Sequence, residues 1–141
     1  MNTFHPLAIL LQENESVLMK TILNYSLKYG YSQYTSTLVE AWRLSISGLT
    51  NAISQYIASN PNEIPDIRVD SNYRDDFIAR FGVIEAQRHR SRGVDLGMFL
   101  GLFKYYRDSY IDLVQDKVVD DEQVSDFTKY LVRCFDRIEL S

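Results

Sequence analysis

Apolar residues recur along most of this chain at steps of three and four, the spacing of amphipathic helices. Strict alternation of apolar and polar residues never runs long enough to predict a strand. A short apolar run, Leu7 to Leu11, predicts a short N-terminal helix. Five longer helices are expected at about 15–28, 35–58, 75–92, 95–118 and from 120 onward. The pattern therefore predicts an all-α bundle of about five main helices plus a short N-terminal helix.

A few proline, glycine and aspartate residues set the predicted helix ends. Pro61 and Pro65 interrupt the one long irregular connection, between the second and third main helices. Gly93 is expected to end the third helix, and Asp95 is expected to cap the start of the fourth. A length of 141 residues, with 45% apolar and 24% charged residues, is that of one ordinary globular domain. Residues 1–141 are therefore predicted to form a single domain.

Each predicted helix has one apolar face that is expected to be buried. In the first and third main helices these faces comprise Val17, Leu18, Ile22, Leu23 and Leu27, and Phe77, Ile78, Phe81 and Ile84. In the second helix the face comprises Leu38, Trp42, Ile46, Leu49, Ile53 and Tyr56. In the last two helices they comprise Phe99, Leu102, Phe103, Tyr106, Tyr110 and Leu113, and Phe127, Leu131, Cys134 and Ile138. The last face stays apolar to the final residues, which fits either an ordinary terminal helix or a helix that continues into a downstream domain.

Charge and cysteine content narrow the expected partners and compartment. A formal net charge of −4 and a pI near 5.1 argue against nucleic acid as a partner, since phosphate neutralisation needs a clustered basic surface. The local basic cluster of Arg88, His89, Arg90 and Arg92 is expected to be a solvated helix face. A single cysteine, Cys134, cannot form an internal disulfide and favours a reducing, cytoplasmic location. No segment approaches about 18 consecutive apolar residues, so no membrane span is expected.

Residues for catalysis are scarce in this sequence. A nucleophile needs a neighbouring base, and that base needs an orienting partner, yet the chain has only two histidines, His5 and His89. No phosphate-binding glycine loop, paired-histidine metal motif or serine nucleophile elbow occurs. His5 precedes Pro6 in a segment expected to be mobile and chemically inert. We therefore expect no enzymatic activity from this chain.

His89 is the remaining candidate, at the end of the third main helix and near the side that carries Ile78. Three interpretations of it stay open. It caps or flanks the helix end, or it coordinates an iron between two helices, or it accepts a phosphoryl group that Arg92 steadies. Only the second makes His89 a metal ligand. An iron-binding slot would be lined by aromatic residues, namely Trp42, Phe99, Phe103 and Tyr106.

Gly97 and Gly101 form a Gly-x-x-x-Gly pair on the fourth main helix. Each glycine costs about 1 kcal/mol of helix propensity relative to alanine, so some compensation is expected. Two glycines one turn apart allow close approach of another helix backbone, or of a flat ligand. Close helix packing is the expected use.

Residues His89 to Asp95 resemble the stretch after the proximal histidine of globin-coupled sensors, where His-x-x-x-Gly and an apolar residue lead into a long helix. Leu96 to Val114, with Phe-Lys-Tyr-Tyr-Arg at Phe103 to Arg107, is similar to the equivalent helix of non-haem globin-like domains in stressosome proteins and sensor kinases. Val132 to Leu140 is similar to the connecting helix of such input domains. The resemblance covers roughly the second half of the chain.

This resemblance implies a globin-like input domain at the N-terminus of a longer signalling protein. Such a domain would dimerise through its last two helices and pass a change in helix packing to an output module such as a histidine kinase. In the haem-binding branch His89 would be the ligand of haem b, and in the other branch no cofactor is bound. Residues His89 to Gly93 also resemble the His-x-x-Lys-Gly core of histidine phosphotransfer domains, with Arg92 in place of Lys. That alternative implies a phosphorelay through His89.

Overall fold

The computed structural model describes residues 3–29, 39–67 and 76–140, with the side chains of 39–42 outside the description. In these ranges the regular structure is entirely helical, which confirms the predicted all-α class. The helices are α1 (His5–Glu13), α2 (Glu15–Lys28), α3 (Val39–Ser59), α4 (Phe77–Ser91), α5 (Leu96–Lys117) and α6 (Asp121–Leu140). The expected first four residues of the second main helix, 35–38, lie outside the described residues.

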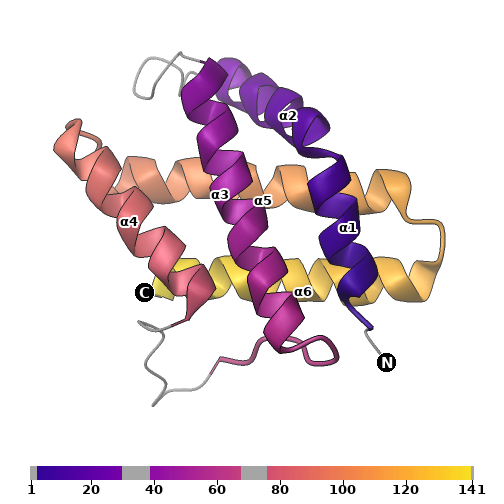
Figure 1. Ribbon diagram of the computed structural model, residues 1–141. Helices are drawn as coiled ribbons and strands as arrows, with labels where there is room; N and C mark the ends of the chain where they lie inside the picture. Colours follow the sequence, from indigo (N-terminus) through magenta and orange to yellow (C-terminus); the bar gives the residue numbers. More distant parts are fainter. Residues whose placement is uncertain (1–2, 30–38, 68–75, 141) are drawn as a thin grey trace.

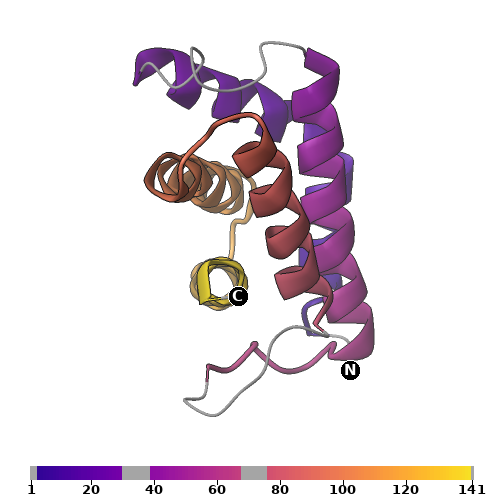
Figure 2. The ribbon, with the colours of Figure 1, turned by 90° about the vertical axis from the view of Figure 1, so that its left-hand side faces the viewer.

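The helices form two crossing layers. In Figure 1, α5 and α6 run antiparallel and side by side, α1, α3 and α4 cross in front of them, and α2 lies above α5. Figure 2 views the same pair end-on, with α4 between it and α3. Helix α3 contacts α1, α2 and α4, whereas α4 contacts α6 and α2 contacts α5. The crossing layers place the core between them and bring the start of α5 next to the end of α6.

Two aspartates begin the helices that frame the candidate site. The Asp95 carboxylate accepts from the Met98 N–H at 2.8 Å, which confirms the predicted cap of α5. Asp76 caps α4 in the same way, through the Ile78 N–H at 3.3 Å. Between the two helices Gly93 has a φ of +82°, a left-handed conformation that strains any residue with a Cβ. The tight α4–α5 connection therefore depends on this glycine.

The predicted buried faces of α5 and α6 are confirmed. All six of the residues predicted on α5 and all four on α6 are buried. Phe103 and Tyr110 of α5 pack edge to face on Phe135 of α6, which was not among the predicted residues, with ring-centroid separations of 6.3 Å and 5.7 Å. The Tyr110 hydroxyl also shares a 2.8 Å hydrogen bond with the Thr50 hydroxyl of α3. The ring contacts join α5 to α6, and the hydrogen bond between Tyr110 and Thr50 joins this pair to α3 in the other layer.

The predicted face of α2 was wrong in part. Leu18 and Ile22 are buried as expected, but Val17 and Leu27 are exposed. Burial on this helix follows a step of four and continues to Ser26 instead. Helix α2 packs on α3 and α5 along this narrow stripe, so the flanking apolar residues remain in solvent.

The predicted face of α4 was also wrong in part, and this error bears on His89. Phe77 and Ile84 are exposed, whereas the buried residues include Ile78, Gly82 and His89. Helix α4 is oriented by the close approach of α6, since a Cβ on Gly82 would lie only 2.7 Å from the Ile138 Cγ2. A small residue, not a bulky one, therefore determines which side of α4 faces the core.

Gly97, one of the two glycines predicted to allow close helix packing, has no such role in the structure. Gly97 is exposed, and an added Cβ would meet only the Asp95 carboxylate at 3.5 Å. Close approach occurs at Gly82 and at Gly48, where a Cβ would lie 3.0 Å from the Phe81 ring. The prediction of close helix packing at Gly97 was therefore wrong.

The N-terminal segment is fixed to the core. Phe4 is buried, its ring lies 4.5 Å from that of Tyr130, and its N–H donates to the Pro61 carbonyl at 2.9 Å. His5 is the first residue of α1, so the expectation of a mobile segment around it was wrong. Across the parts of the chain that the structure describes, no helix has both the length and the apolar composition needed to cross a membrane.

Candidate functional site

His89 lies in the last turn of α4 with its side chain 10% exposed. Its Nδ1 is 2.8 Å from the Glu85 carbonyl oxygen. Because a carbonyl can only accept, Nδ1 carries a hydrogen and donates it, which leaves Nε2 as the acceptor of the neutral ring. The Glu85 carboxylate lies 3.9 Å from the same Nδ1 and accepts from the Arg88 guanidinium at 3.2 Å. His89 is thus held by its own helix, one turn back.

Three of the four predicted aromatic residues form a packed row along α5. The centroids of the Phe99 and His89 rings lie 5.1 Å apart, and the two ring planes make an angle of 56°. The ring centroids of Phe99 and Phe103 are 4.7 Å apart, and those of Phe103 and Tyr106 are 5.6 Å apart. All three side chains are buried. The side chain of the fourth, Trp42, lies outside the described residues.

This packing bears on the haem interpretation. A haem ligated by His89 would need an open slot beside the imidazole, but Phe99 lies against that ring. Phe103 and Tyr106 fill the core, where Phe103 also contacts Phe135. The packing of Phe99, Phe103 and Tyr106 therefore does not fit a haem at His89 in this arrangement, and we derive no step through one.

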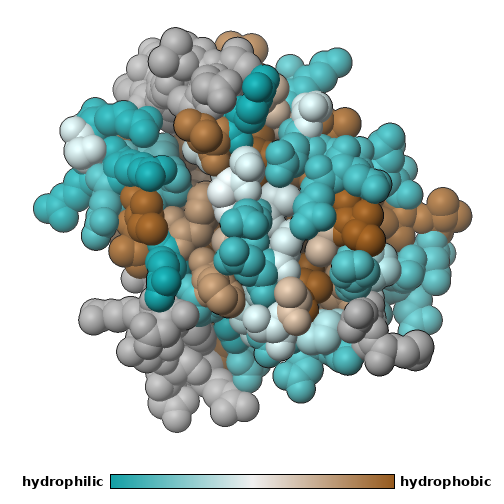
Figure 3. Space-filling view, viewed as in Figure 1, coloured by the Kyte–Doolittle hydropathy of each residue, from teal (hydrophilic) through white to brown (hydrophobic). Residues whose placement is uncertain are grey.

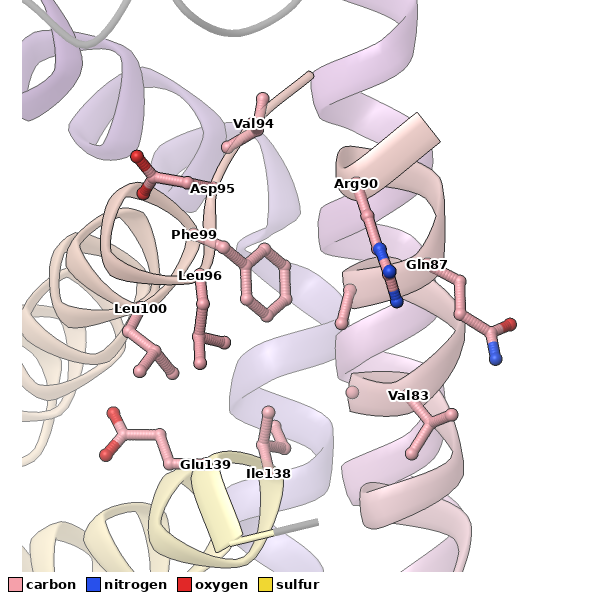
Figure 4. A pocket seen from close by; sticks show the side chains of 12 residues that line it. Val83, Gln87, Arg90, Val94, Asp95, Leu96, Phe99, Leu100, Ile138 and Glu139 are labelled. Atoms are coloured by element: carbon pink, nitrogen blue, oxygen red, sulfur yellow. The ribbon is translucent and has the colours of Figure 1, made fainter. Parts of the chain in front are cut away.

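A cavity of about 490 Å³ opens at the corner where α4, the start of α5 and the end of α6 meet. We call it the corner cavity, and Figure 4 shows its walls. The residues that line it are Gly82, Val83, Ala86, Gln87, Arg90, Val94, Asp95, Leu96, Phe99, Leu100, Ile138 and Glu139. Its volume lies in the range of about 300–1,000 Å³ typical of small-molecule sites. Of the predicted site residues, only Phe99 lines it.

Three charged residues line the corner cavity, and two of them are already engaged. Asp95 caps α5. Glu139 pairs with Lys104 at 2.6 Å. Arg90 is exposed and makes no ion pair with any residue that the structure describes. The charge still available to a ligand at this site is therefore positive.

A second cluster ties α6 to the start of α4. The Arg137 guanidinium, 9% exposed, donates to the Asp76 carboxylate at 2.9 Å and to the Asp66 carboxylate at 3.0 Å. It also lies 5.2 Å from the centre of the Tyr56 ring. Burial alone would lower the pKa of Arg137, but the hydrogen bond to Asp76 helps to raise that pKa above its ordinary value. Arg137 therefore stays charged and holds α6, the 60–67 segment and α4 together.

Metal-ligating side chains and the cysteine thiol offer less chemistry than the two clusters described above. Among the described residues no group of three or more His, Cys, Asp and Glu side chains is arranged to hold a metal ion. Cys134 is fully buried, and burial raises the pKa of its thiol far above the ordinary value. A thiol in such surroundings is a poor nucleophile.

Sequence reasoning missed both Glu85 and Arg137. Glu85 is one turn before His89 and shares its buried side, so the helical wheel that places His89 near Ile78 also contains the signal for Glu85. Arg137 gives no such signal, because a charged residue beside an apolar seam is normally solvated.

Comparisons of this chain with protein-family models, with curated proteins and with solved structures found no match.

Proposed function

We propose that this chain is a cytoplasmic, globin-like sensory domain in which occupancy of the corner cavity changes the packing of α6 and so controls an output module such as a histidine kinase. The observation that supports this best is the position of the cavity between α4, α5 and the last turn of α6. A ligand there contacts three helices at once. Any difference in its contacts between two arrangements of α6 shifts the balance between them.

The contact between α4 and α6 is suited to such a change. Gly82 admits Ile138 so closely that an added Cβ would also lie 3.3 Å from the Ile138 carbonyl oxygen. Both residues line the corner cavity. Close-packed helices respond to added volume by discrete shifts, because they have no slack to absorb it. A ligand beside this contact is therefore in a position to move α6.

The phosphorelay alternative receives less support from the geometry. A phosphoryl acceptor must enter a partner's active site, but the His89 side chain is buried and its ring lies against Phe99. His89 is also followed within a few residues by the turn at Gly93 and a new helix, α5. We propose a structural role for His89, in which it fixes the end of α4 beside the cavity.

We also propose that the domain dimerises through α5 and α6. Leu96, the first residue of α5, and Leu140, the last of α6, are 69% and 60% exposed on neighbouring helices. On the opposite layer, the face shown in Figure 3 carries its hydrophobic side chains in separate patches among hydrophilic ones. Light scattering should show a dimer that Leu96→Glu weakens. A monomer at every concentration would contradict this part of the proposal.

The signalling proposal is tested by adding one methyl group to the α4–α6 contact. The chain is fused in helical register to a histidine kinase catalytic core, and autophosphorylation is measured. Gly82→Ala forces Ile138 to move and should change kinase activity about tenfold or more. Gly97→Ala is the matched control, since its Cβ meets no other helix. Circular dichroism verifies that both variants remain helical.

Equal kinase activity of the Gly82→Ala, Gly97→Ala and unmodified chimeras, at several helix registers of the junction, would contradict the sensory proposal. Hydrogen exchange gives an independent measurement on the chain itself. Gly82→Ala should speed amide exchange in the last turns of α6, because the displaced helix end opens more often. Unchanged exchange in α6 would show that it does not respond to the α4 contact.

A further inference from the structure

We infer that the corner cavity takes an amphipathic carboxylate, such as a medium-chain fatty acid, with its carboxylate at Arg90 and its apolar chain between α5 and α6. This inference rests on the proposed sensory function and names the class of ligand. Figure 4 shows Leu96, Phe99, Leu100 and Ile138 directed to the space between the helices. These side chains offer aliphatic and aromatic surface and no hydrogen-bonding groups. They select an apolar body for the ligand.

The charge of the ligand follows from which charged side chains are free. Arg90 lies along α4 at the edge of the space in Figure 4 and makes no ion pair with a described residue. A guanidinium presents a planar fork of donors that matches a carboxylate with two parallel hydrogen bonds. Arg88, in contrast, is paired with Glu85 and does not line the cavity. Arg90 is therefore the residue that recognises the anionic group.

The two acids of the cavity do not cancel this positive charge. The Asp95 carboxylate is directed to the backbone of α5, where it accepts from Met98. The Glu139 carboxylate accepts from Lys104 at 2.6 Å, on the side away from α4. A cationic ligand would have to break one of these interactions and would also face Arg90. The corner cavity should therefore discriminate against amines as well as against neutral alcohols.

The test uses octanoate, decanoate, 1-decanol and decylamine, each below its aggregation limit, with the 141-residue chain. Calorimetry gives the affinity, and NMR shifts of the Leu96, Leu100 and Ile138 amides locate the binding. Decanoate should bind more tightly than octanoate by about fourfold for each added methylene. It should also bind about tenfold or more tightly than 1-decanol, while decylamine should bind most weakly.

Arg90→Gln should weaken decanoate binding about tenfold and leave 1-decanol binding unchanged, because only the carboxylate loses its partner. Arg92→Gln, an exposed arginine that does not line the cavity, is the matched control and should bind decanoate normally. Equal binding of decanoate and 1-decanol, insensitive to Arg90→Gln, would overturn the ligand class while the Gly82→Ala chimera still tests the sensory function. Failure of all four probes to shift the cavity amides would overturn the inference.

Discussion

The buried Arg137 cluster makes a strong prediction about stability. Arg137→Met keeps a long, flexible side chain but removes the guanidinium, so the Asp76 carboxylate, 11% exposed, loses its charged partner. Breaking a buried ion pair by removing one member costs about 3–5 kcal/mol, since the other charge is left uncompensated. Asp76 keeps its bond to the Ile78 N–H and some solvent contact, which favours the lower limit. We therefore expect a loss of about 3 kcal/mol.

The assay is thermal and urea unfolding followed by circular dichroism. A loss of about 3 kcal/mol should lower the Tm by roughly 10 °C for a domain of this size. Arg133→Met is the matched control on the same helix, because Arg133 makes no ion pair within the described ranges, and it should change stability by about 0.5 kcal/mol or less. The double variant Arg137→Met with Asp76→Asn should recover part of the loss, since no buried charge remains unpaired. A cost below about 1 kcal/mol, or strictly additive effects of the two substitutions, would refute the role assigned to this cluster.

Three other predictions follow from single contacts. Tyr110→Phe should cost about 1–2 kcal/mol by removing a buried hydrogen bond. Tyr130→Phe should be neutral or stabilising, because the buried Tyr130 hydroxyl has no hydrogen-bond partner among the described residues; equal losses in urea unfolding would contradict this. The hydrogen bond that the Tyr25 hydroxyl donates to Asp112 raises the pKa of Tyr25 from 10.0 to about 12. The stabilisation by this hydrogen bond is therefore present below pH 10 and is lost as the pH rises towards 12. NMR titration should show the pKa of Tyr25 falling towards 10 in Asp112→Ala. Gly93→Ala should cost about 1 kcal/mol in the same unfolding assay through its left-handed backbone alone, since its Cβ would meet nothing within 4 Å.

The parts of the fold that could be predicted are those in which one helix carries its own signal. The faces of α5 and α6 are wide, aromatic and regular, so the helical period located them correctly. The start of α5 was predictable because an aspartate cap is a local interaction, here from Asp95 to Met98. Such features depend on residues within one or two turns of each other. Sequence periodicity and capping rules contain that information directly.

The buried face of α4 could not be predicted from periodicity and capping rules. Its bulky residues, Phe77 and Ile84, suggested a face that the structure exposes. The true face is set by Gly82, which admits Ile138 from a helix more than fifty residues further along the chain. Once that contact rotates α4, His89 is carried into the buried side and Phe77 out of it. No property of the α4 sequence taken alone contains this outcome.

The candidate site depends even more on distant partners. His89 was the predicted candidate, but the structure buries it. Arg90 is exposed, as predicted for a solvated cluster, and it lies at the edge of a cavity that was not predicted. What makes Arg90 a candidate ligand-binding residue is that the other charges nearby are occupied, and one of these pairings, Lys104 with Glu139, spans 35 residues. An available charge is a property of the whole set of neighbours. It follows that a binding residue of this kind can be recognised only after the three helices that surround it are in place.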